Sequence, residues 1–499
     1  MNPAGPRPVT RREWILVGLA ALLALAVNFA LLLRGFGEGD AARLAVQALA
    51  WHDAGELEIL SYTVRVSPLY LTGLRRLLES GVQPESLPAW MNAVSAVSGA
   101  LLWVPLYALW RRAVNAPVAA VACLLFAVTP AFWHANHYGM PHLPAFLFFV
   151  VQSVCTARFL VADGARFLAW FALACAGACV AMGLKADIVM VFAASIGLAL
   201  VLGRAGLRNL AACAAVPLVG LFFVTRYAHS IAPGLGELGD LGGHAGRWSE
   251  RFPITLEAIL NPNNVVVPAY GAGALLFACM AASVLFALWS PTHRRLGLWA
   301  LGWSAPALLF WGLREGNSAR HMMAIYPPLC LLVAAAASAL LRSPRLRAGA
   351  LAVLVIGNYF AAPAYSRTFR MGGRLFGGQA RVQADVDLVT ERAREFCELR
   401  APLKVLGGNW TLPYVVWQLM LSSDRYRIAW GHTSEEDQWS DMQLETHFAG
   451  RRELVQLSFS YRKLFTPLGA VAWSAQDEIE VLDRPRPSSR PGKSRQVSD

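Results

Sequence analysis

An uninterrupted apolar stretch, WILVGLAALLALAVNFALLL, occupies residues 14–33, and its one polar side chain is that of Asn28. About 20 apolar residues in a helix cross a bilayer core that is roughly 30 Å thick. The stretch is too long for the core of a signal peptide, and no suitably placed A-x-A-like cleavage site accompanies it. It therefore predicts a first membrane span.

The composition agrees with that prediction. Of the 499 residues, 56% are hydrophobic and only 15% are charged, whereas an ordinary soluble domain has roughly a quarter charged residues. These values exclude a disordered chain and disfavour a soluble enzyme. The net charge of +12 indicates Lys and Arg in the loops of a membrane protein and not a nucleic-acid partner. There is no CxxC pair that would indicate a zinc site.

Further apolar runs predict a mainly α, polytopic membrane helix bundle of about eleven spans. Their approximate bounds are 14–33, 92–110, 116–132, 143–161, 167–183, 188–203, 210–225, 266–289, 296–312, 322–341 and 348–364.

Arginine in the short loops predicts the orientation, because cytoplasmic loops are enriched in Lys and Arg. The arginines fall on alternate sides of successive spans, so they share one face. They are Arg7, Arg11, Arg12, Arg111, Arg112, Arg166, Arg204, Arg208, Arg294, Arg295, Arg342, Arg345 and Arg347. We therefore expect a cytoplasmic N-terminus and, with an odd number of spans, an outer C-terminus.

Three parts are expected along the chain. Residues 1–365 form the membrane module, with a long first outward loop at 35–90 in which 41–52 and 69–79 read as helices. Residues 366–483 form a small outer α/β domain, and the tail at 484–499 is basic and disordered. Within the α/β domain we expect helices at 385–399 and near 413–421, and strands at 403–406 and near 426–430.

The first candidate site motif is GEGDAARLA at residues 37–45, which places Glu38 and Asp40 just after the first span. A carboxylate at the outer surface can accept a proton from an attacking hydroxyl group. The structural alternative is that Asp40 N-caps a helix that starts at Ala41, which is a common role for Asp. The two roles are compatible, since a capping carboxylate keeps a free oxygen.

The second motif is a group of three histidines, His134, His137 and His142, between two spans. The five-residue step from His137 to His142 is not the spacing of a helical zinc site. Contacts to a lipid headgroup, or a position at the membrane interface, explain the group better. We therefore expect no metal at this site, although the sequence leaves a divalent ion open.

Two further motifs carry cations. Lys185, in GLKAD at 183–187, lies in an apolar stretch, where an ionisable residue usually has a partner or a function. It either reaches the surface beside Asp187 or contacts a phosphate, for which an ammonium group is well suited. Arg320 and His321 precede a span on the same outer face, so Lys185 and Arg320 together could hold a diphosphate or a phosphodiester.

As a set, these motifs resemble the GT-C superfamily of polyprenyl-phosphate-sugar-dependent glycosyltransferases over residues 10–345. The nearest likeness is to bacterial aminoarabinose lipid A transferases and to the family-39 protein O-mannosyltransferases. DAARLA at 40–45 is similar to the family motif D-E-A-R-Y-A, and SPLY at 67–70 is similar to P-P-L-Y. GLK at 183–185 is similar to G-L-x-K, and RHMMAIYPP at 320–328 is similar to R-Y/H…P-P. The chain departs from the pattern at Ala41, where the family often has Glu, and at His142, where it often has Asp.

The resemblance implies transfer of a sugar from a polyprenyl-phosphate carrier to a lipid, glycan or protein acceptor, at the outer face of a bacterial inner membrane. The transfer is inverting and needs no nucleotide or other cofactor. Asp40 would be the general base, and Glu38 would assist it. The residues expected to bind substrate are Lys185, Arg320, His321, His142 and Arg43.

Two other classes of function stay open at this stage. A transporter or flippase of a lipid-linked saccharide would explain the spans and Lys185. However, the charges gather at outer span ends and no internal repeat is visible, whereas transporters usually show repeats. A non-catalytic lipid-binding subunit would explain the replacements at Ala41 and His142.

Overall fold

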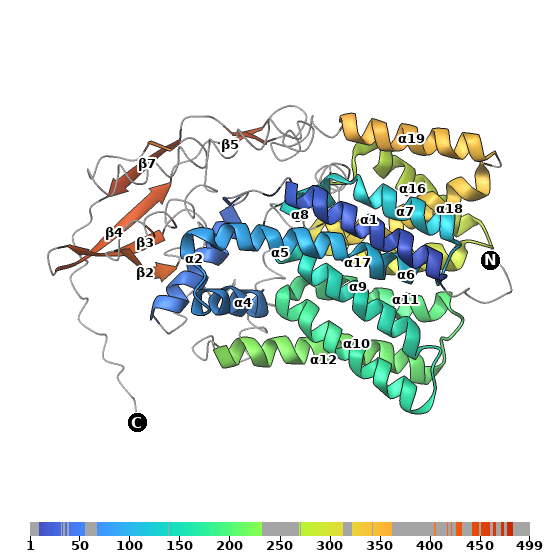
Figure 1. The fold of residues 1–499 in the computed structure, drawn as a ribbon, viewed down its shortest axis with the longest axis horizontal. Coiled ribbons are helices and arrows are strands. Elements are labelled where there is room, and N and C mark those ends of the chain that lie inside the picture. Colours follow the sequence, from blue (N-terminus) through green and yellow to red (C-terminus); the bar gives the residue numbers. More distant parts are fainter. Residues whose placement is uncertain are drawn as a thin grey trace, which may run out of the picture. The chain divides into compact units, whose positions relative to one another are not determined.

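In the computed structural model, the described parts of the apolar runs are mainly helical (Figure 1). A helix satisfies its backbone N–H and C=O groups within one segment, which a lipid environment requires. The structure describes residues 9–30, 32, 35–36, 39–54, 67–137, 139–231, 269, 271–312, 322–341, 343–361, 404–405, 417, 421, 426–431, 442–448, 451–459, 463–465, 471–473 and 477–482.

The chain divides into two compact units. Unit 1 comprises residues 1–37, 61–82 and 86–383, and unit 2 comprises residues 38–60, 83–85 and 384–499. The helices of unit 1 are α1 (Arg11–Ala30), α4 (Pro68–Glu79), α5 (Leu87–Leu101), α6 (Trp103–Trp110), α7 (Ala116–Ala127), α8 (Pro130–His137), α9 (His142–Phe159), α10 (Gly164–Leu184), η2 (Ala186–Val191), α11 (Ala193–Val201), α12 (Leu207–Ile231), α16 (Ala274–Trp289), α17 (Arg294–Gly312), η3 (Met323–Ile325), α18 (Tyr326–Leu340) and α19 (Pro344–Ala361). The short helix η1 spans Pro84–Ser86.

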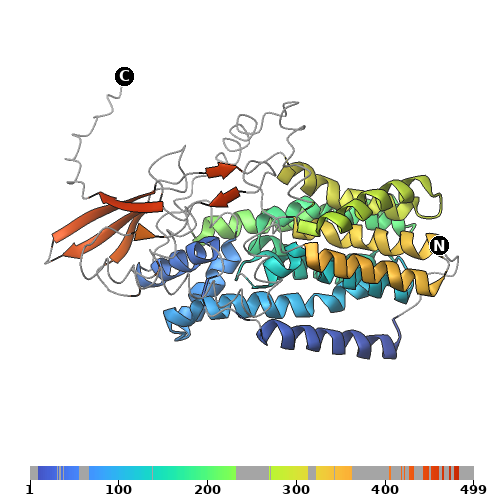
Figure 2. The same ribbon diagram turned by 90° about the horizontal axis from the view of Figure 1, so that it is seen from above.

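The long helices of unit 1 run roughly along one direction in both ribbon views (Figure 2). Among the described residues, 6 helical segments are long and apolar enough to cross a membrane. They are Arg11–Ala30, Pro84–Trp110, His142–Phe159, Gly164–Leu184, Leu207–Ile231 and Met323–Leu340. The chain is therefore a multi-pass membrane protein.

The count of eleven spans stays a prediction. Each expected span overlaps a helix of the structure, but several of these helices are short. Helix α7 has 12 residues, which at 1.5 Å per residue cover only about 18 Å of a core roughly 30 Å thick. Length alone therefore does not make α7 a complete crossing.

Large apolar side chains cover the outside of unit 1. The exposed fraction is 63% for Leu22, 68% for Leu23 and 70% for Phe222. Leu22 and Leu23 share helix α1 with further exposed apolar residues, among them Trp14, Ile15, Leu16 and Leu19, and large apolar patches are rare on soluble monomers. This surface suits contact with lipid chains.

Aromatic rings form the centre of the buried core. The Trp303 ring lies 5.1 Å from Phe149 and 5.7 Å from Trp299, measured between ring centroids. The two tryptophans also bond the backbone: Trp299 Nε1 donates to the Ala194 carbonyl at 3.0 Å, and Trp303 Nε1 to the Ala324 carbonyl at 2.8 Å. These bonds join α17 to α11 and to η3. They therefore hold in place the two stretches in which a short helix precedes a longer one, η2–α11 and η3–α18.

A pair of buried asparagines joins α1 to α8. Asn28 Nδ2 donates to Asn136 Oδ1 at 3.2 Å, and Asn136 Nδ2 donates to Asn28 Oδ1 at 2.6 Å. Asn28 also donates to the Ala96 carbonyl on α5 at 3.0 Å. Since a buried amide must find partners, the one polar side chain of the first apolar stretch positions three helices.

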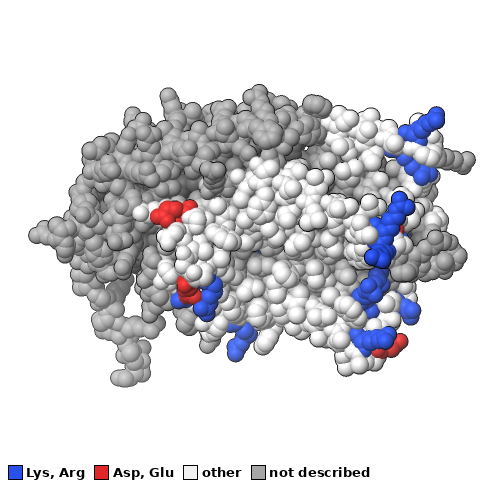
Figure 3. Space-filling model, viewed as in Figure 1, with Lys and Arg blue, Asp and Glu red and all other residues white. Residues whose placement is uncertain are grey.

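Most of the Lys and Arg side chains visible in Figure 3 gather at one end of unit 1, and most of the described surface beside them carries no charged side chain. The ends of the helices show the same pattern. Arg11 begins α1, Arg111 follows α6, Arg208 lies in the first turn of α12, and Arg294 begins α17. We refer to this end as the arginine-rich end. That it faces the cytoplasm stays a prediction from the sequence.

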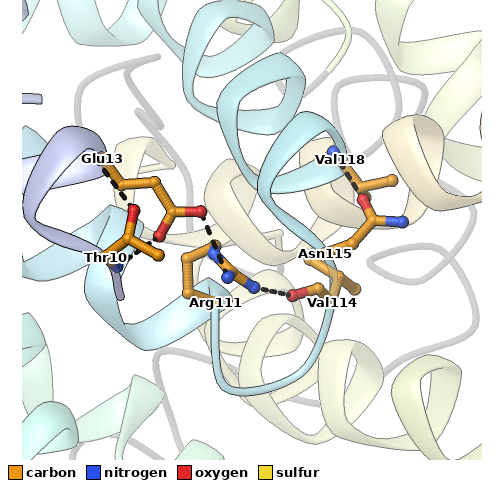
Figure 4. A network of polar contacts seen from close by, with 6 residues as sticks. All are labelled: Thr10, Glu13, Arg111, Val114, Asn115 and Val118. Atoms are coloured by element: carbon orange, nitrogen blue, oxygen red, sulfur yellow. Dashed lines mark hydrogen bonds and ion pairs between the residues drawn. The ribbon is translucent and has the colours of Figure 1, made fainter. Parts of the chain in front are cut away.

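Arg111 links two helices at the arginine-rich end (Figure 4). Its Nη2 lies 3.3 Å from Glu13 Oε1, and its Nη1 donates to the Val114 carbonyl at 3.0 Å. Glu13 also forms a capping box with Thr10, in which the Thr10 N–H donates to Glu13 Oε2 at 2.9 Å. One carboxylate therefore caps α1 and neutralises the guanidinium group at the end of α6.

Unit 2 contains helix α2 (Gly39–Ala54) and an antiparallel sheet. The sheet has the strand order β1-β7-β4-β3-β2, and β5 pairs with β6 separately. The strands are β1 (Lys404–Val405), β2 (Tyr426–Gly431), β3 (Met442–Phe448), β4 (Arg451–Phe459), β5 (Lys463–Phe465), β6 (Val471–Trp473) and β7 (Asp477–Leu482). In β3 and β4, Leu444 lies opposite Val455 and Met442 opposite Leu457.

Strands β1 and β2 lie at the two positions where the sequence predicts strands. The strands after them were not predicted, although β3 alternates Met442, Leu444, Thr446 and Phe448 with polar residues, which is the period-two signal of a strand. The expected helix at 385–399 and the tail at 484–499 lie outside the described residues, and the small outer α/β domain stays a prediction.

The asparagine pair gives a prediction about stability. Asn136→Ala should lower the free energy of unfolding by about 1 kcal/mol, because hydrogen bonds between membrane helices contribute about 0.6–1.7 kcal/mol. Asn28→Ala in the Asn136→Ala background should cost much less than Asn28→Ala alone, since the partner is already absent. Thermal unfolding of the four proteins in detergent measures this cycle. Fully additive losses would show that the two amides do not depend on each other.

Candidate functional site

The site is built around the end of α10, where Lys185 interrupts a helical stretch. The Lys185 N–H still donates to the Ala181 carbonyl at 2.9 Å, but the Lys185 backbone is extended, with φ −156° and ψ 105°. The chain then continues as η2. The carboxyl end of a helix carries partial negative charge, which favours a cation at this position.

Lys185 forms an ion pair with Asp187. Lys185 Nζ lies 3.0 Å from Asp187 Oδ2, and the two side chains are only 11% and 15% exposed. Charges this shielded from solvent need a partner, because removing either one alone leaves a buried charge uncompensated. The pairing considered from the sequence is therefore confirmed.

Helix α4 packs closely against this end of α10. A Cβ atom at Gly183 would lie 3.1 Å from Leu69 Cβ and 3.4 Å from Phe223 Cε1, so only glycine allows this approach without displacing its neighbours. Tyr227 Oη, on α12, donates to Thr72 Oγ1 at 2.9 Å. The SPLY segment, which contains Leu69, is thereby brought against the GLK segment.

The same helix fixes the loop before α9. Tyr70 Oη donates to the Gly139 carbonyl at 2.7 Å, and Ser95 Oγ donates to the Met140 carbonyl at 3.1 Å. Burial raises the pKa of Tyr70, so its phenol stays protonated and keeps this donor. His142 begins α9 and is 5% exposed, so a buried imidazole follows directly after a loop held by two side chains.

Asn92 joins this loop to the end of the first span. Its Nδ2 donates to the Gly35 carbonyl at 2.9 Å. Gly139 has a left-handed backbone, with φ +59°, and a Cβ there would lie 2.8 Å from Asn92 Oδ1. In unit 1, three segments therefore lie next to α5: the start of the first outward loop, helix α4 of the SPLY segment, and the loop before His142.

The segment that follows Arg320 and His321 also reaches this region. Ser304 Oγ donates to the Ile325 carbonyl at 2.9 Å, and with the Trp303 bond to Ala324 this fixes η3. Helix η3 packs against η2, which contains Asp187. Arg320 and His321 themselves lie outside the described residues, so their convergence with Lys185 stays a prediction.

Helix α2 corrects the expected boundary at Asp40. The helix begins at Gly39, so Asp40 lies inside the first turn and does not precede a helix that starts at Ala41. A carboxylate in the first turn is still favourable, because the amino end of a helix carries partial positive charge. Arg43 lies one turn further on in the same helix. The side chains of Asp40 and Arg43 and the whole of Glu38 lie outside the described residues.

The motifs in the sequence do not indicate the groups that hold the site together. Tyr70 was quoted only as part of SPLY, and Ser95, Gly139 and Thr72 were not considered. A signal existed for Tyr70, because a buried tyrosine hydroxyl usually has a hydrogen-bond partner. Its partner is a backbone carbonyl 69 positions away, which no local pattern indicates.

The described residues include no group of three or more His, Cys, Asp or Glu side chains that could hold a metal ion. The side chains of His134 and His137 lie outside the described residues. What the described groups can do chemically is present a nearly buried ammonium group, Lys185, to an anion. A ligand phosphate would have to replace or share its contact with Asp187.

The comparisons with known proteins identify the fold. No family profile and no curated protein sequence matches the chain. Two solved structures of ArnT from Cupriavidus metallidurans match its fold. The structure bound to undecaprenyl phosphate is 19% identical, with a TM-score of 0.53, and the match covers 82% of this chain and 75% of that one. The apo structure is 18% identical, with a TM-score of 0.51, and the match covers 82% and 74%. The chain therefore shares its fold with ArnT, which agrees with the resemblance found in the motifs.

Gly139 gives a prediction about the His142 loop. Gly139→Ala should destabilise the protein more than Gly81→Ala, although both glycines have positive φ, at +59° and +91°. Both changes cost the roughly 1–2 kcal/mol of a left-handed alanine. Only the methyl group added at position 139 would also collide, with Asn92 Oδ1 and with Met91 Cβ at 2.9 Å, whereas nothing lies within 4 Å at Gly81. Thermal unfolding in detergent compares the two, and equal losses would contradict the tight packing of this loop.

Proposed function

We propose that this protein is an integral membrane glycosyltransferase that moves a sugar from a polyprenyl-phosphate carrier to an acceptor at the outer face of a bacterial inner membrane. The observation that carries the proposal is Lys185, a cation held almost out of solvent at the break in α10. The fold shared with ArnT, one of whose structures binds undecaprenyl phosphate, supports it.

The reaction we propose is a single displacement with inversion at the anomeric carbon. Asp40 takes the proton of the acceptor hydroxyl, and the hydroxyl oxygen then forms the new glycosidic bond. The bond between the anomeric carbon and the phosphate oxygen breaks, and polyprenyl phosphate leaves with its electron pair. Asp40 has this role through the resemblance of residues 40–45 to the first-loop motif, and Glu38 assists it.

Lys185 and Arg320 stabilise the charge that develops on the leaving phosphate. Fixed cations in a site of low dielectric constant stabilise such charge more than water does. His142, His321 and Arg43 orient the phosphate or the acceptor. The acceptor is a lipid, a glycan or a protein, and the donor lipid reaches the site from the membrane.

The direct test uses purified protein in lipid nanodiscs with a labelled polyprenyl-phosphate sugar and a mixture of candidate acceptors. We expect donor binding and release of polyprenyl phosphate with a new glycosidic bond. Binding without turnover would favour a non-catalytic lipid-binding subunit. Movement of the intact donor between leaflets without transfer would favour a flippase.

Asp40→Asn should lower turnover by about 10²–10⁴-fold, the usual contribution of a general base, because an amide cannot accept the proton. Folding should change by no more than about 0.3–1 kcal/mol, the usual contribution of a charge in the first turn of a helix. Asp53→Asn, in the same helix α2, is the matched control and should keep turnover. Transfer close to wild type by Asp40→Asn would remove this carboxylate from the mechanism and leave Glu38 as the candidate base.

Lys185 and Asp187 should affect phosphate binding in opposite directions. Lys185→Gln should weaken binding of undecaprenyl phosphate about tenfold to a hundredfold, since it removes one charge-assisted hydrogen bond. Asp187→Asn should tighten binding, because the phosphate no longer competes with a carboxylate for the ammonium group. Titration of the lipid into nanodisc-bound protein measures both affinities. Weaker binding in Asp187→Asn would show that the carboxylate positions Lys185 and does not compete with the ligand.

A further inference from the structure

Among the described residues, the arginine-rich end has more arginines than carboxylates that pair with them. Arg111 pairs with Glu13, and Arg208 Nη2 lies 3.3 Å from Asp163 Oδ1. Within the part of the chain that the structure describes, Arg112 and Arg158 have no carboxylate partner. The carboxylates available at this end are therefore already used by other arginines.

The two guanidinium groups come from neighbouring helix ends. Arg112 lies two residues after the end of α6, and Arg158 lies in the last turn of α9, which packs against α6. Arg158 Cζ lies 5.8 Å from the centre of the Trp170 ring on α10, within the range of a cation–π contact. The guanidinium of Arg158 therefore has a defined position above an aromatic side chain.

Arg112 and Arg158 lie at the ends of two helices, α6 and α9, that pack against each other. Partial burial and the positive charge of Arg158 both lower the pKa of Arg112. An anion bound beside both guanidinium groups would offset this effect, because a nearby opposite charge favours the charged form. The forked guanidinium group fits the oxygens of a phosphate better than an ammonium group does.

The surface next to the pair is suited to lipid chains. On α10, Leu168 and Leu173 are 64% and 52% exposed. Trp170 lies between these two leucines in the sequence and is partly buried. Tryptophan is the type of side chain that lies at a membrane interface, with one edge in apolar and one in polar surroundings. A cationic site thus adjoins an apolar surface on one helix.

We propose that Arg112 and Arg158 bind the phosphate of an anionic phospholipid from the leaflet at the arginine-rich end, with Trp170 beneath the headgroup and the acyl chains along α10. Basic sites between membrane helices bind anionic headgroups in this way. The site is separate from the proposed phosphate contact at Lys185: α10 has 21 residues, or about 31 Å of helix, and the two sites adjoin its opposite ends.

The competing explanation is that these arginines only contribute to the general positive charge of this end. A matched control, in which two other arginines are replaced, distinguishes the two explanations. Arg294 and Arg345 are exposed, lie at or near the start of α17 and α19, and carry the same total charge as the proposed pair. Removing either pair changes the net charge equally, but only one pair forms the proposed site.

The experiment measures phosphatidylglycerol retained by the full-length protein, using native mass spectrometry with phosphatidylcholine as the zwitterionic reference. Arg112→Gln/Arg158→Gln should weaken binding of the anionic lipid about tenfold or more, the effect of losing charge-assisted hydrogen bonds. Arg294→Gln/Arg345→Gln should change it less than about twofold. Equal losses in the two double variants would overturn the proposal, as would equal retention of the two lipids by the wild type.

Two further arms complete the test. Inorganic phosphate at the concentration of the lipid should not displace phosphatidylglycerol, because it lacks the acyl chains. Displacement would show that the site binds a small free anion, and it would overturn the proposal that the ligand is a lipid. If the double variant does not fold, Arg158→Gln alone decides the matter, because this exposed side chain can be replaced without leaving a buried charge; it should lose anionic-lipid binding while its melting temperature in phosphatidylcholine stays unchanged.

Discussion

The close approach of α4 to the end of α10 is the constraint on which the candidate site depends. Leu69 occupies the space that a side chain at residue 183 would need, and the next residue, Tyr70, bonds the loop before α9. Two consecutive side chains of α4 thus hold two different segments in place. Because a buried phenol without its partner would cost the full desolvation of that group, the contact to Gly139 and the contact to Gly183 favour the same position of α4.

The positions of the membrane helices could be predicted from the sequence because lipid leaves the backbone few choices. Each apolar run must satisfy its own N–H and C=O groups, so hydropathy alone marks it as a helix. The expected helices at 41–52 and 69–79 are confirmed as α2 and α4 for a similar reason, since apolar residues recur there at helical spacing. The ion pair of Lys185 with Asp187 could also be predicted from the sequence, because the partners are two residues apart.

Contacts between distant segments could not be predicted in this way. Asn28 and Asn136 are 108 positions apart, and a polar residue in an apolar run indicates only that some partner exists. The boundary of α2 shows a different limit. The Asp40 cap was inferred from residue preference, but the helix starts at Gly39, within the one or two residues by which such signals commonly err. The strands β3–β7 were missed, although β3 alternates as a strand does, because they lie in a polar region where no buried face is evident from composition.

The ion pairs of unit 1 differ in what must move to open them. The pair of Arg111 and Glu13 joins two helices, so exposing Arg111 to a ligand would require α1 and α6 to separate. The pair of Lys185 and Asp187 lies within one short segment at a break in the helix. A rotation of either side chain is enough to exchange the carboxylate for another anion, while the Leu69 and Trp303 contacts keep α10 and η3 in place. The same physical need, a counter-charge for each buried cation, therefore yields a link between two helices at one end of the bundle and an ion pair within one short segment at the end of α10.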